Sequence, residues 1–272
     1  MEEGKIPTEE ELKEEWMMMS EWYTSFPQKF TSLLIENFVP FMQLSSATKV
    51  VEVACGPGNG IKILRRHLPE EVAIHASDLC PKMVETSRSL NVPNTQVIEA
   101  NNESLPYSNE EFDRYLANLS LMLVGDADKM LGEAYRVLKS GGIAAFSIWG
   151  EKQDCTLFGA IDGVNEQFGV RKAVKFRAPY YLTDKNVIKE KFERAGFSKY
   201  LVYDCPAPLP MSTLEEVVEF YKTMPPMVRT KEANPELYEQ CVEAFREKAR
   251  VKLHQNHEPF VFAARIILAF KE

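Results

Sequence analysis

Short apolar runs alternate with amphipathic segments through the middle of the chain. Five of these runs, rich in β-branched or aromatic residues, predict strands: "TKVVEVA", "EVAIHASD", "TQVIEA", "FDRYLANLSL" and "IAAFSIW". Segments with apolar residues at helical spacing stand between them, for example "PKMVETSRSL", which places Pro81 in the first turn of a helix. Strand–helix alternation at this spacing predicts a parallel sheet with right-handed crossovers. We therefore expect a doubly wound α/β core over residues 48–150.

The two flanks of this core show other patterns. Residues 9–42 have a helical pattern with an aromatic stripe, and after Trp149 we expect an irregular stretch to about residue 182. A helix is then expected in "TDKNVIKEKFERAG", followed by two strands, "FSKYLVYD" and "EPFVFAARIILAFK". Two helices are expected between these strands, and they form an insertion that is too long for a hairpin loop. The fold class is thus a mostly parallel, seven-stranded, Rossmann-like α/β sheet. We expect three parts: an N-terminal helical segment (1–45), the core (46–204 and 259–272) and a helical cap over the substrate site (205–258).

Charge and composition narrow the class of protein. The formal net charge is −8, and the chain contains no run rich in lysine and arginine, so nucleic acid is not expected as a partner. The first fifteen residues are rich in glutamate and lack an apolar h-region, which argues against a secretory signal. No window reaches the roughly 18 consecutive apolar residues of a membrane span. We therefore expect a soluble, cytoplasmic protein.

The cysteines and histidines do not form a recognisable metal-binding pattern. The five cysteines lie far apart without a CxxC pair, which argues against a zinc site and against disulfides in a reducing compartment. His254 and His257 stand three residues apart, but no carboxylate–histidine motif such as HExxH accompanies them. We expect no metal site.

Three glycines alternate with other residues directly after the first predicted strand, in "VVEVACGPGNG". A dinucleotide-binding loop requires G-x-G-x-x-G/A, but Ile61 occupies the third small position. A phosphate-binding loop also fails, because Ile61 and Lys62 follow Gly60 where lysine and a hydroxyl residue are required. The remaining pattern is E-x-A-x-G-x-G-x-G. It indicates either a loop that approaches a ligand closely or a tight strand-to-helix turn.

An acidic residue closes the second predicted strand, about 20 residues after the glycine loop. This residue, Asp78, stands where a carboxylate meets ribose hydroxyls in nucleoside sites at the carboxyl ends of parallel strands. Aspartate is also a good N-cap, and a helix is expected to begin at Pro81. The glycine loop next to it favours the ribose interpretation.

These motifs together resemble class I S-adenosylmethionine-dependent methyltransferases, of the small-molecule type similar to ubiquinone/menaquinone-biosynthesis methyltransferases. The resemblance runs from about Lys49 to Trp149. "VVEVACGPGNG" resembles the family's first motif, whose glycines admit the methionine part of the cofactor, and "SDLCPKMVETSR" resembles the second, which holds the ribose. "ANNESLPYSNEEFD" and "LANLSLMLVGDADKMLGEAYRVLKSGG" resemble two later stretches of the family. The resemblance implies S-adenosyl-L-methionine as cofactor, and these residues as its contacts: Tyr23, Glu52, Ala54, Gly56, Gly58, Asp78, Leu79, Met83, Asn101, Asn102, Glu103, Asn118 and Leu119.

The chain departs from the family pattern at several positions. Asn101 replaces the usual aspartate that accepts from the adenine amino group; an amide oxygen can still accept, so Asn101→Asp is expected to keep or improve affinity. Asn102 would offer its backbone N–H to the ring. Met122 stands where many relatives carry a histidine. Tyr23 matches a tyrosine that reaches the cofactor carboxylate in relatives, although a packing role suits it equally.

Methyl transfer from a sulfonium donor is an in-line displacement, so the enzyme mainly aligns the reactants in a dry pocket. A base is needed only if the acceptor must lose a proton, and Tyr180, Tyr181 and His254 are candidates that suit structural roles better. Aromatic and methionine residues of the flanks suit an apolar acceptor or an ordinary core: Trp149, Tyr180, Tyr221, Met224 and Met227. We expect transfer to a small, partly apolar molecule. The alternatives are a protein methyltransferase and an inactive cofactor-binding or scaffold protein.

Overall fold

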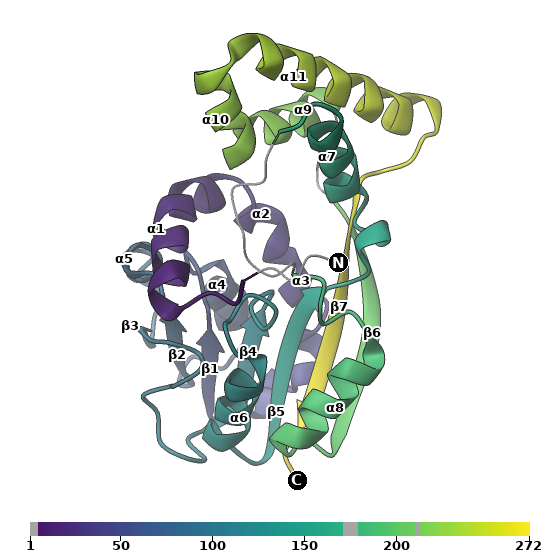
Figure 1. The fold of residues 1–272 in the computed structure, drawn as a ribbon. Helices are drawn as coiled ribbons and strands as arrows, with labels where there is room; N and C mark the ends of the chain where they lie inside the picture. The colour runs from purple at the N-terminus through teal and green to yellow at the C-terminus, as the bar shows by residue number, and fades with distance from the viewer. Residues whose placement is uncertain (1–4, 171–178, 210, 212) are drawn as a thin grey trace.

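The computed structural model describes residues 5–170, 179–209, 211 and 213–272. Within these residues, seven strands form one sheet with helices on both faces and a further helical layer beyond one end (Figure 1). The strand order is β3-β2-β1-β4-β5-β7-β6. The strands are β1 (Lys49–Val53), β2 (Ala73–Asp78), β3 (Thr95–Glu99), β4 (Phe112–Asn118), β5 (Leu138–Trp149), β6 (Lys199–Pro208) and β7 (Val261–Phe270).

The first five strands pair in parallel, and β7 runs antiparallel between β5 and β6. This arrangement confirms the predicted mostly parallel α/β sheet. The chain order reverses between β1 and β4, and in open sheets of this kind ligands bind at that point, beyond the carboxyl ends of the strands.

The central strand β1 is apolar on both faces because helices cover both. Val51 and Val53 pack in the core under α6 (Ala127–Val137) and α8 (Lys185–Ala195). Val50 packs in the opposite core with α4 (Asn59–His67) and α5 (Pro81–Ser89). Glu52 points to the same side as Val50, which brings a carboxylate under the start of α4.

The N-terminal segment is helical, as predicted. Helix α1 (Glu9–Ser25) begins with a capping box between Thr8 and Glu11. Short elements follow: α2 (Gln28–Thr31), α3 (Leu33–Glu36), η1 (Val39–Met42) and η2 (Leu44–Ser46).

The structure corrects the prediction after Trp149. Part of the stretch expected to be irregular is helix α7 (Thr156–Gln167), preceded by the short η3 (Lys152–Asp154). Gly159 and Gly163 weaken the helical signal of its sequence, but burial of Leu157 and Ile161 offsets the cost of about 1 kcal/mol for each glycine. The rest of that stretch includes residues 171–178, which lie outside the described residues.

The insertion before β7 contains three helices rather than the two predicted: α9 (Leu214–Thr223), α10 (Pro225–Ala233) and α11 (Pro235–Arg250), followed by η4 (Val251–Gln255). Pro225 and Pro226 occupy the first turn of α10, where a missing N–H costs little. Strand β6 also continues past the expected boundary at residue 204, because its pairing with β7 reaches Pro208.

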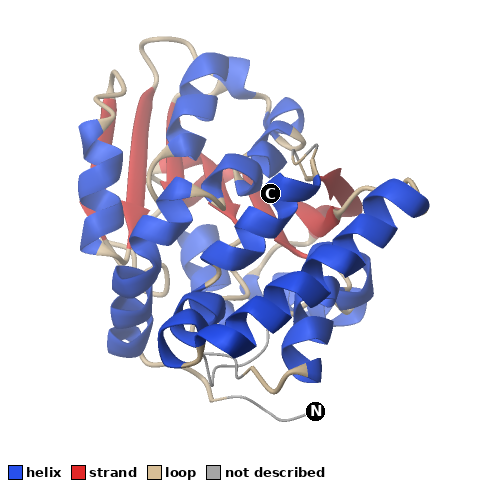
Figure 2. Cartoon of the chain, turned by 90° about the horizontal axis from the view of Figure 1, so that it is seen from above, coloured by secondary structure: helices blue, strands red, loops and turns tan. Residues whose placement is uncertain are grey.

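Helices α9, α10 and α11, here called the cap helices, lie with α7 beyond the end of the sheet toward which the parallel strands run (Figure 1). Viewed from that side, helices cover much of the end of the sheet (Figure 2). The cap helices and α7 share an apolar core, to which Phe30 and Phe262 also belong. Among the described residues, no helix has the length and hydropathy to cross a membrane.

Candidate cofactor and acceptor site

The glycine loop joins β1 to α4 at the carboxyl end of the sheet. Two of its three glycines are explained by packing inside the protein. A Cβ on Gly58 would lie 2.6 Å from Ser87 Oγ, and a Cβ on Gly60 would lie 1.9 Å from Glu52 Oε1. Gly56 differs, because a Cβ there would meet only Tyr23, at 3.7 Å. Gly56 therefore marks the part of the loop that faces the site.

Asp78 holds the glycine loop against the end of β2. Its Oδ2 accepts from the backbone N–H of Gly56 at 2.8 Å, and its Oδ1 accepts from that of Cys80 at 2.9 Å. The N-cap residue of α5 is Cys80, and Asp78 lies two residues before it, so helix capping does not explain Asp78. Burial raises the pKa of Asp78 to about 6, although its hydrogen bonds oppose the shift.

Glu52 is a second buried carboxyl group in the same place, with 2% of its surface exposed. Within the described part of the chain, its Oε2 has no hydrogen-bond partner. Burial, followed by the charge of Asp78, raises the pKa of Glu52 to about 8. A buried polar atom without a partner costs free energy and requires an explanation, and a ligand group is one.

Tyr23, from α1, completes this group of residues. Its ring lies next to Gly56, and its hydroxyl is 2.8 Å from Thr31 Oγ1. Burial raises the pKa of Tyr23 to about 12, and the charges of Asp78 and Glu52 contribute to the increase. The N-terminal segment thus supplies one wall of the site, although the hydroxyl is already engaged by Thr31.

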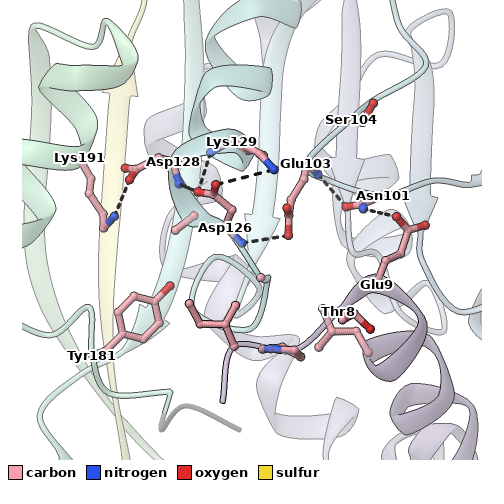
Figure 3. Close-up of a pocket in the computed structure, with 15 residues that line it drawn as sticks. Thr8, Glu9, Asn101, Glu103, Ser104, Asp126, Asp128, Lys129, Tyr181 and Lys191 are labelled. Carbon is pink, nitrogen blue, oxygen red and sulfur yellow. Dashed lines mark hydrogen bonds and ion pairs between the residues drawn. The ribbon is translucent and has the colours of Figure 1, made fainter. Parts of the chain in front are cut away.

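The predicted adenine-side residues lie after β3. Asn101 donates from Nδ2 to Glu9 Oε2 at 2.8 Å, and its Oδ1 accepts from Glu103 N at 2.9 Å. Asn102 is buried, and its Oδ1 has no hydrogen-bond partner among the described residues. The carboxyl group of Glu103 accepts from Asp126 N at 3.0 Å. A cavity of about 700 Å³ adjoins Asn101 and Glu103 (Figure 3).

Hydrogen bonds to Thr31 of α2 and to Ser147 of β5 fix the end of β4. Asn118 donates from Nδ2 to Thr31 O at 3.1 Å, and its Oδ1 accepts from Ser147 Oγ at 2.6 Å. Leu119 follows with a positive φ of 50°, as does Ala54 in the glycine loop with 48°. A left-handed conformation is uncommon for a residue with a side chain, and such residues cluster at functional sites.

The two apolar residues predicted to adjoin the adenine flank the start of α5. Leu79 is partly buried and Met83 is buried. Cys80 between them lies against α1, with its Sγ 3.5 Å from Met17 Sδ. These contacts place α1 over the end of β2.

The predicted acceptor residues separate into two groups. Tyr221 and Met227 are fully buried in the core of the cap, where Tyr221 stacks on Phe245 at 4.2 Å and donates to Asn165 Oδ1 at 2.9 Å. This placement favours the packing role that the sequence left open for both. Met224 is only partly buried, at the junction of α9 and α10.

Trp149 and Tyr180 form the second group, below the cap. Trp149 ends β5 and is partly buried, with its ring 5.5 Å from that of Phe158 and 5.1 Å from that of Phe262. Tyr180 is partly buried beside Cys155, and burial raises its pKa far above neutrality. Of the other two candidate bases, His254 is exposed in η4 at the end of the cap, and Tyr181 lines the same cavity as Asn101 (Figure 3).

Sequence reasoning missed the residues that hold the site together. Thr31, Ser147 and Glu9 each bond to a predicted site residue from a segment distant in sequence, and no local motif announces such a pairing. Within the described residues, no group of three His, Cys, Asp or Glu side chains is arranged to hold a metal ion. All five cysteines are free thiols.

Comparison with known proteins gives matches to the core. Residues 51–146 match the family profile described as a methyltransferase domain. Over 97 residues the chain is 36% identical to the chloroplastic 2-methyl-6-phytyl-1,4-hydroquinone methyltransferase 1 of Oryza sativa subsp. japonica, covering 35% of this chain and 29% of that protein. Over 113 residues it is 32% identical to the ubiquinone/menaquinone biosynthesis C-methyltransferase UbiE of Xanthomonas oryzae pv. oryzae, covering 39% of this chain and 44% of the relative.

The matched segment is thus less than half the length of either relative. Similarity of fold extends further. The crystal structure of the [4+2]-cyclase SpnF superposes with a TM-score of 0.61, covering 97% of each chain at 15% identity. The sheet order, the glycine loop with Asp78 bonded to it, and the profile match all agree with a methyltransferase domain. In residues 51–146 the chain is thus similar to class I, S-adenosylmethionine-dependent methyltransferases, and among these to the quinone C-methyltransferases.

Proposed function

We propose that this protein is an S-adenosylmethionine-dependent methyltransferase that transfers a methyl group to a small, partly apolar molecule. The observation that carries the proposal is the buried pair Glu52 and Asp78 beside the open side of Gly56. The two carboxyl groups lie close enough for the charge of Asp78 to raise the pKa of Glu52. Among the described residues, Glu52 Oε2 has no hydrogen-bond partner. When bound, S-adenosylmethionine would supply an activated methyl group and the positive charges that such a pair favours.

The residues near this pair fit the remainder of the cofactor. The Asp78 carboxylate accepts from the backbone N–H groups of Gly56, Cys80 and Leu79, and a carboxylate has about four acceptor positions, which leaves capacity for a ribose hydroxyl. Leu79 and Met83 offer apolar surface to an adenine ring, and Asn101 and Asn102 lie at the end of the next strand. The ring of Tyr23 lies against the glycine loop at Gly56 and covers that part of the site.

The protein's contribution to transfer would be alignment and the exclusion of water. The nucleophile, methyl group and sulfur must lie in line, with reacting atoms about 3–3.5 Å apart. The raised pKa of Tyr180 keeps this phenol protonated near neutral pH, so Tyr180 would not act as a base. An acceptor that is already nucleophilic at the working pH would need no base.

Aromatic rings support an acceptor with apolar surface. Trp149 ends the strand next to β4, and Ser147 on that strand is bonded to Asn118, so Trp149 lies near the switch point of the sheet. Phe158 and Trp22 are partly buried and, like Trp149, pack against the apolar core that the cap helices share with α7. We therefore propose that Trp149 and Met224 contact the acceptor, and that Tyr221 and Met227 stabilise the cap.

Calorimetry and a labelling experiment test this function. Titration with S-adenosylmethionine and S-adenosylhomocysteine should give saturable heats, whereas NAD should give none, because Ile61 replaces the third small residue of a dinucleotide loop. Tight NAD binding without S-adenosylmethionine binding would contradict the proposal.

Incubation with methyl-labelled cofactor and a cell extract should then place label in a metabolite. Label in protein would instead indicate a protein methyltransferase. Cofactor binding without label in any fraction would indicate an inactive cofactor-binding protein.

A further inference from the structure

A chain of hydrogen bonds joins the first turn of α1 to the start of α6 (Figure 3). Glu9 Oε2 accepts from Asn101 Nδ2 at 2.8 Å, Asn101 Oδ1 accepts from Glu103 N at 2.9 Å, and Glu103 Oε1 accepts from Asp126 N at 3.0 Å. An amide has donors on one end and an acceptor on the other. Because a carboxylate only accepts, Glu9 determines which end of Asn101 faces α1.

The same face of α1 lies along the ends of β3 and β2. Its contacts occur every four residues: Lys13 pairs with Glu99, Met17 Sδ lies 3.5 Å from Cys80 Sγ, and Glu21 pairs with Lys82. Four-residue steps place side chains on one side of a helix. Leu12 and Ser20 of α1 are buried, and Trp22 and Tyr23 near its end bond to Thr223 and Thr31, so this stripe adds to the contacts that hold the helix against the core.

The lead-in to α1 also lies close to the loop after β4. A Cβ on Gly125 would lie 3.1 Å from Pro7 O and 3.1 Å from Glu103 Oε1. The start of α1 therefore fits between the two loops that follow β3 and β4, and Asn101 is the residue of the β3 loop that it engages directly.

We propose that Glu9 is a positioning residue for Asn101, and that its carboxylate is the reason this chain carries asparagine where the family pattern has aspartate. This inference rests on the proposed cofactor site. With Nδ2 held by Glu9, Oδ1 faces away from α1 and retains one lone pair for an exocyclic amino group. An aspartate at this position would bring two carboxylates to hydrogen-bond distance and would push the first turn of α1 away from the site. We therefore expect Asn101→Asp to lower cofactor affinity, whereas the sequence alone predicted that this substitution keeps or improves it.

A charge exchange tests the pair. In Asn101→Asp, affinity for S-adenosylhomocysteine should fall by about three- to tenfold, because a hydrogen bond to a charged group is replaced by repulsion. Glu9→Gln alone should change affinity by less than about twofold, since the amide oxygen of glutamine still accepts. The double variant Glu9→Gln/Asn101→Asp should return to wild-type affinity within about twofold, because the glutamine amide then donates to the new carboxylate.

Glu10→Gln provides the matched control, since Glu10 is an exposed neighbour in the same turn. Combined with Asn101→Asp it removes the same charge from α1 but should not restore affinity. Hydrogen exchange of the ligand-free variants gives a second readout: α1 amides should lose protection in Asn101→Asp and regain it only with Glu9→Gln.

The outcomes separate this inference from the proposed function. If wild-type protein does not bind S-adenosylhomocysteine, the proposed function fails. If wild type binds and Asn101→Asp binds equally well or better, the role assigned to Glu9 is wrong while the cofactor site stands. Equal rescue by Glu9→Gln and Glu10→Gln would also overturn it, because only overall charge would then matter.

Discussion

Replacing Glu52 with glutamine should make the protein more stable at pH 8 than the wild type, although not at pH 5. Glu52 is 2% exposed, and among the described residues its Oε2 lacks a hydrogen-bond partner. Burial and the nearby Asp78 raise its pKa to about 8, against 4.5 for an ordinary glutamate. The folded protein therefore holds a proton that the unfolded chain releases.

The sign and size of the effect follow from this difference. The stability that Glu52 contributes is fully present below pH 4.5 and is lost as the pH rises through 8, because unfolding in that window releases a proton. The loss is about 1.4 kcal/mol for each pH unit between the two pKa values, or on the order of 4 kcal/mol between pH 5 and pH 8. Glutamine has no proton to lose, so its contribution stays constant.

Urea unfolding at pH 5, 6, 7 and 8 measures the effect. The free energy of unfolding of Glu52→Gln minus that of wild type should rise steadily with pH, with unchanged m-values. Subtraction removes the contributions of titrating groups that do not interact with Glu52, and the remaining difference belongs to Glu52 together with the coupled Asp78. Glu10→Gln, at an exposed position, should show a constant difference. A constant difference for Glu52→Gln as well would refute the argument, because Glu52 would then ionise normally in the folded protein.

Three further predictions concern the same site. Asp78→Asn should weaken binding of S-adenosylhomocysteine by about 10- to 150-fold in calorimetry, the range for lost hydrogen bonds to a charged group, and unchanged affinity would restrict Asp78 to a structural role. Gly60→Ala should destabilise the protein by about 1–3 kcal/mol in urea unfolding, because its Cβ would overlap Glu52. Gly159→Ala, which has open space around it, should stabilise the protein by about 0.5–1 kcal/mol. Equal effects of the two substitutions would contradict this placement of Glu52. Trp149→Ala should lower turnover of the acceptor, once identified, much more than cofactor affinity, and the reverse pattern would remove Trp149 from the acceptor site.

The fold was predictable from the sequence because its signals are local. Short apolar runs, rich in β-branched or aromatic residues, with helical segments between them predict a parallel sheet. The errors have local causes too. Gly159 and Gly163 weaken the helical signal of α7, and the unpredicted helix α10 begins with Pro225 and Pro226. In α7, burial of apolar side chains outweighed the low helix propensity of glycine. In α10, the prolines stand in the first turn, where proline does not disfavour a helix.

The site was predictable only in its motifs. The alternating glycines and Asp78 lie together at the carboxyl end of the sheet, but the sequence could not show that Gly58 accommodates Ser87 and that Gly60 accommodates Glu52. Tyr221 and Met227 were named from composition, which does not distinguish a pocket wall from a core. Contacts between residues far apart in the chain depend on the folded arrangement, and a single sequence does not encode them in any local pattern.

The N-terminal segment connects the cofactor loop with the cap. Thr31 bonds to Tyr23 through its hydroxyl and to Asn118 through its carbonyl, and Trp22, next to Tyr23, donates from Nε1 to Thr223 Oγ1 in α9 at 3.3 Å. The profile match covers residues 51–146, and α1, α7 and the cap helices lie outside that range. Similarity in the core therefore bears on how a cofactor is held, because those residues are the shared ones. We therefore propose that the choice of acceptor depends on Trp149 and on the helices outside the profile match, so resemblance to quinone enzymes does not make a quinone the acceptor.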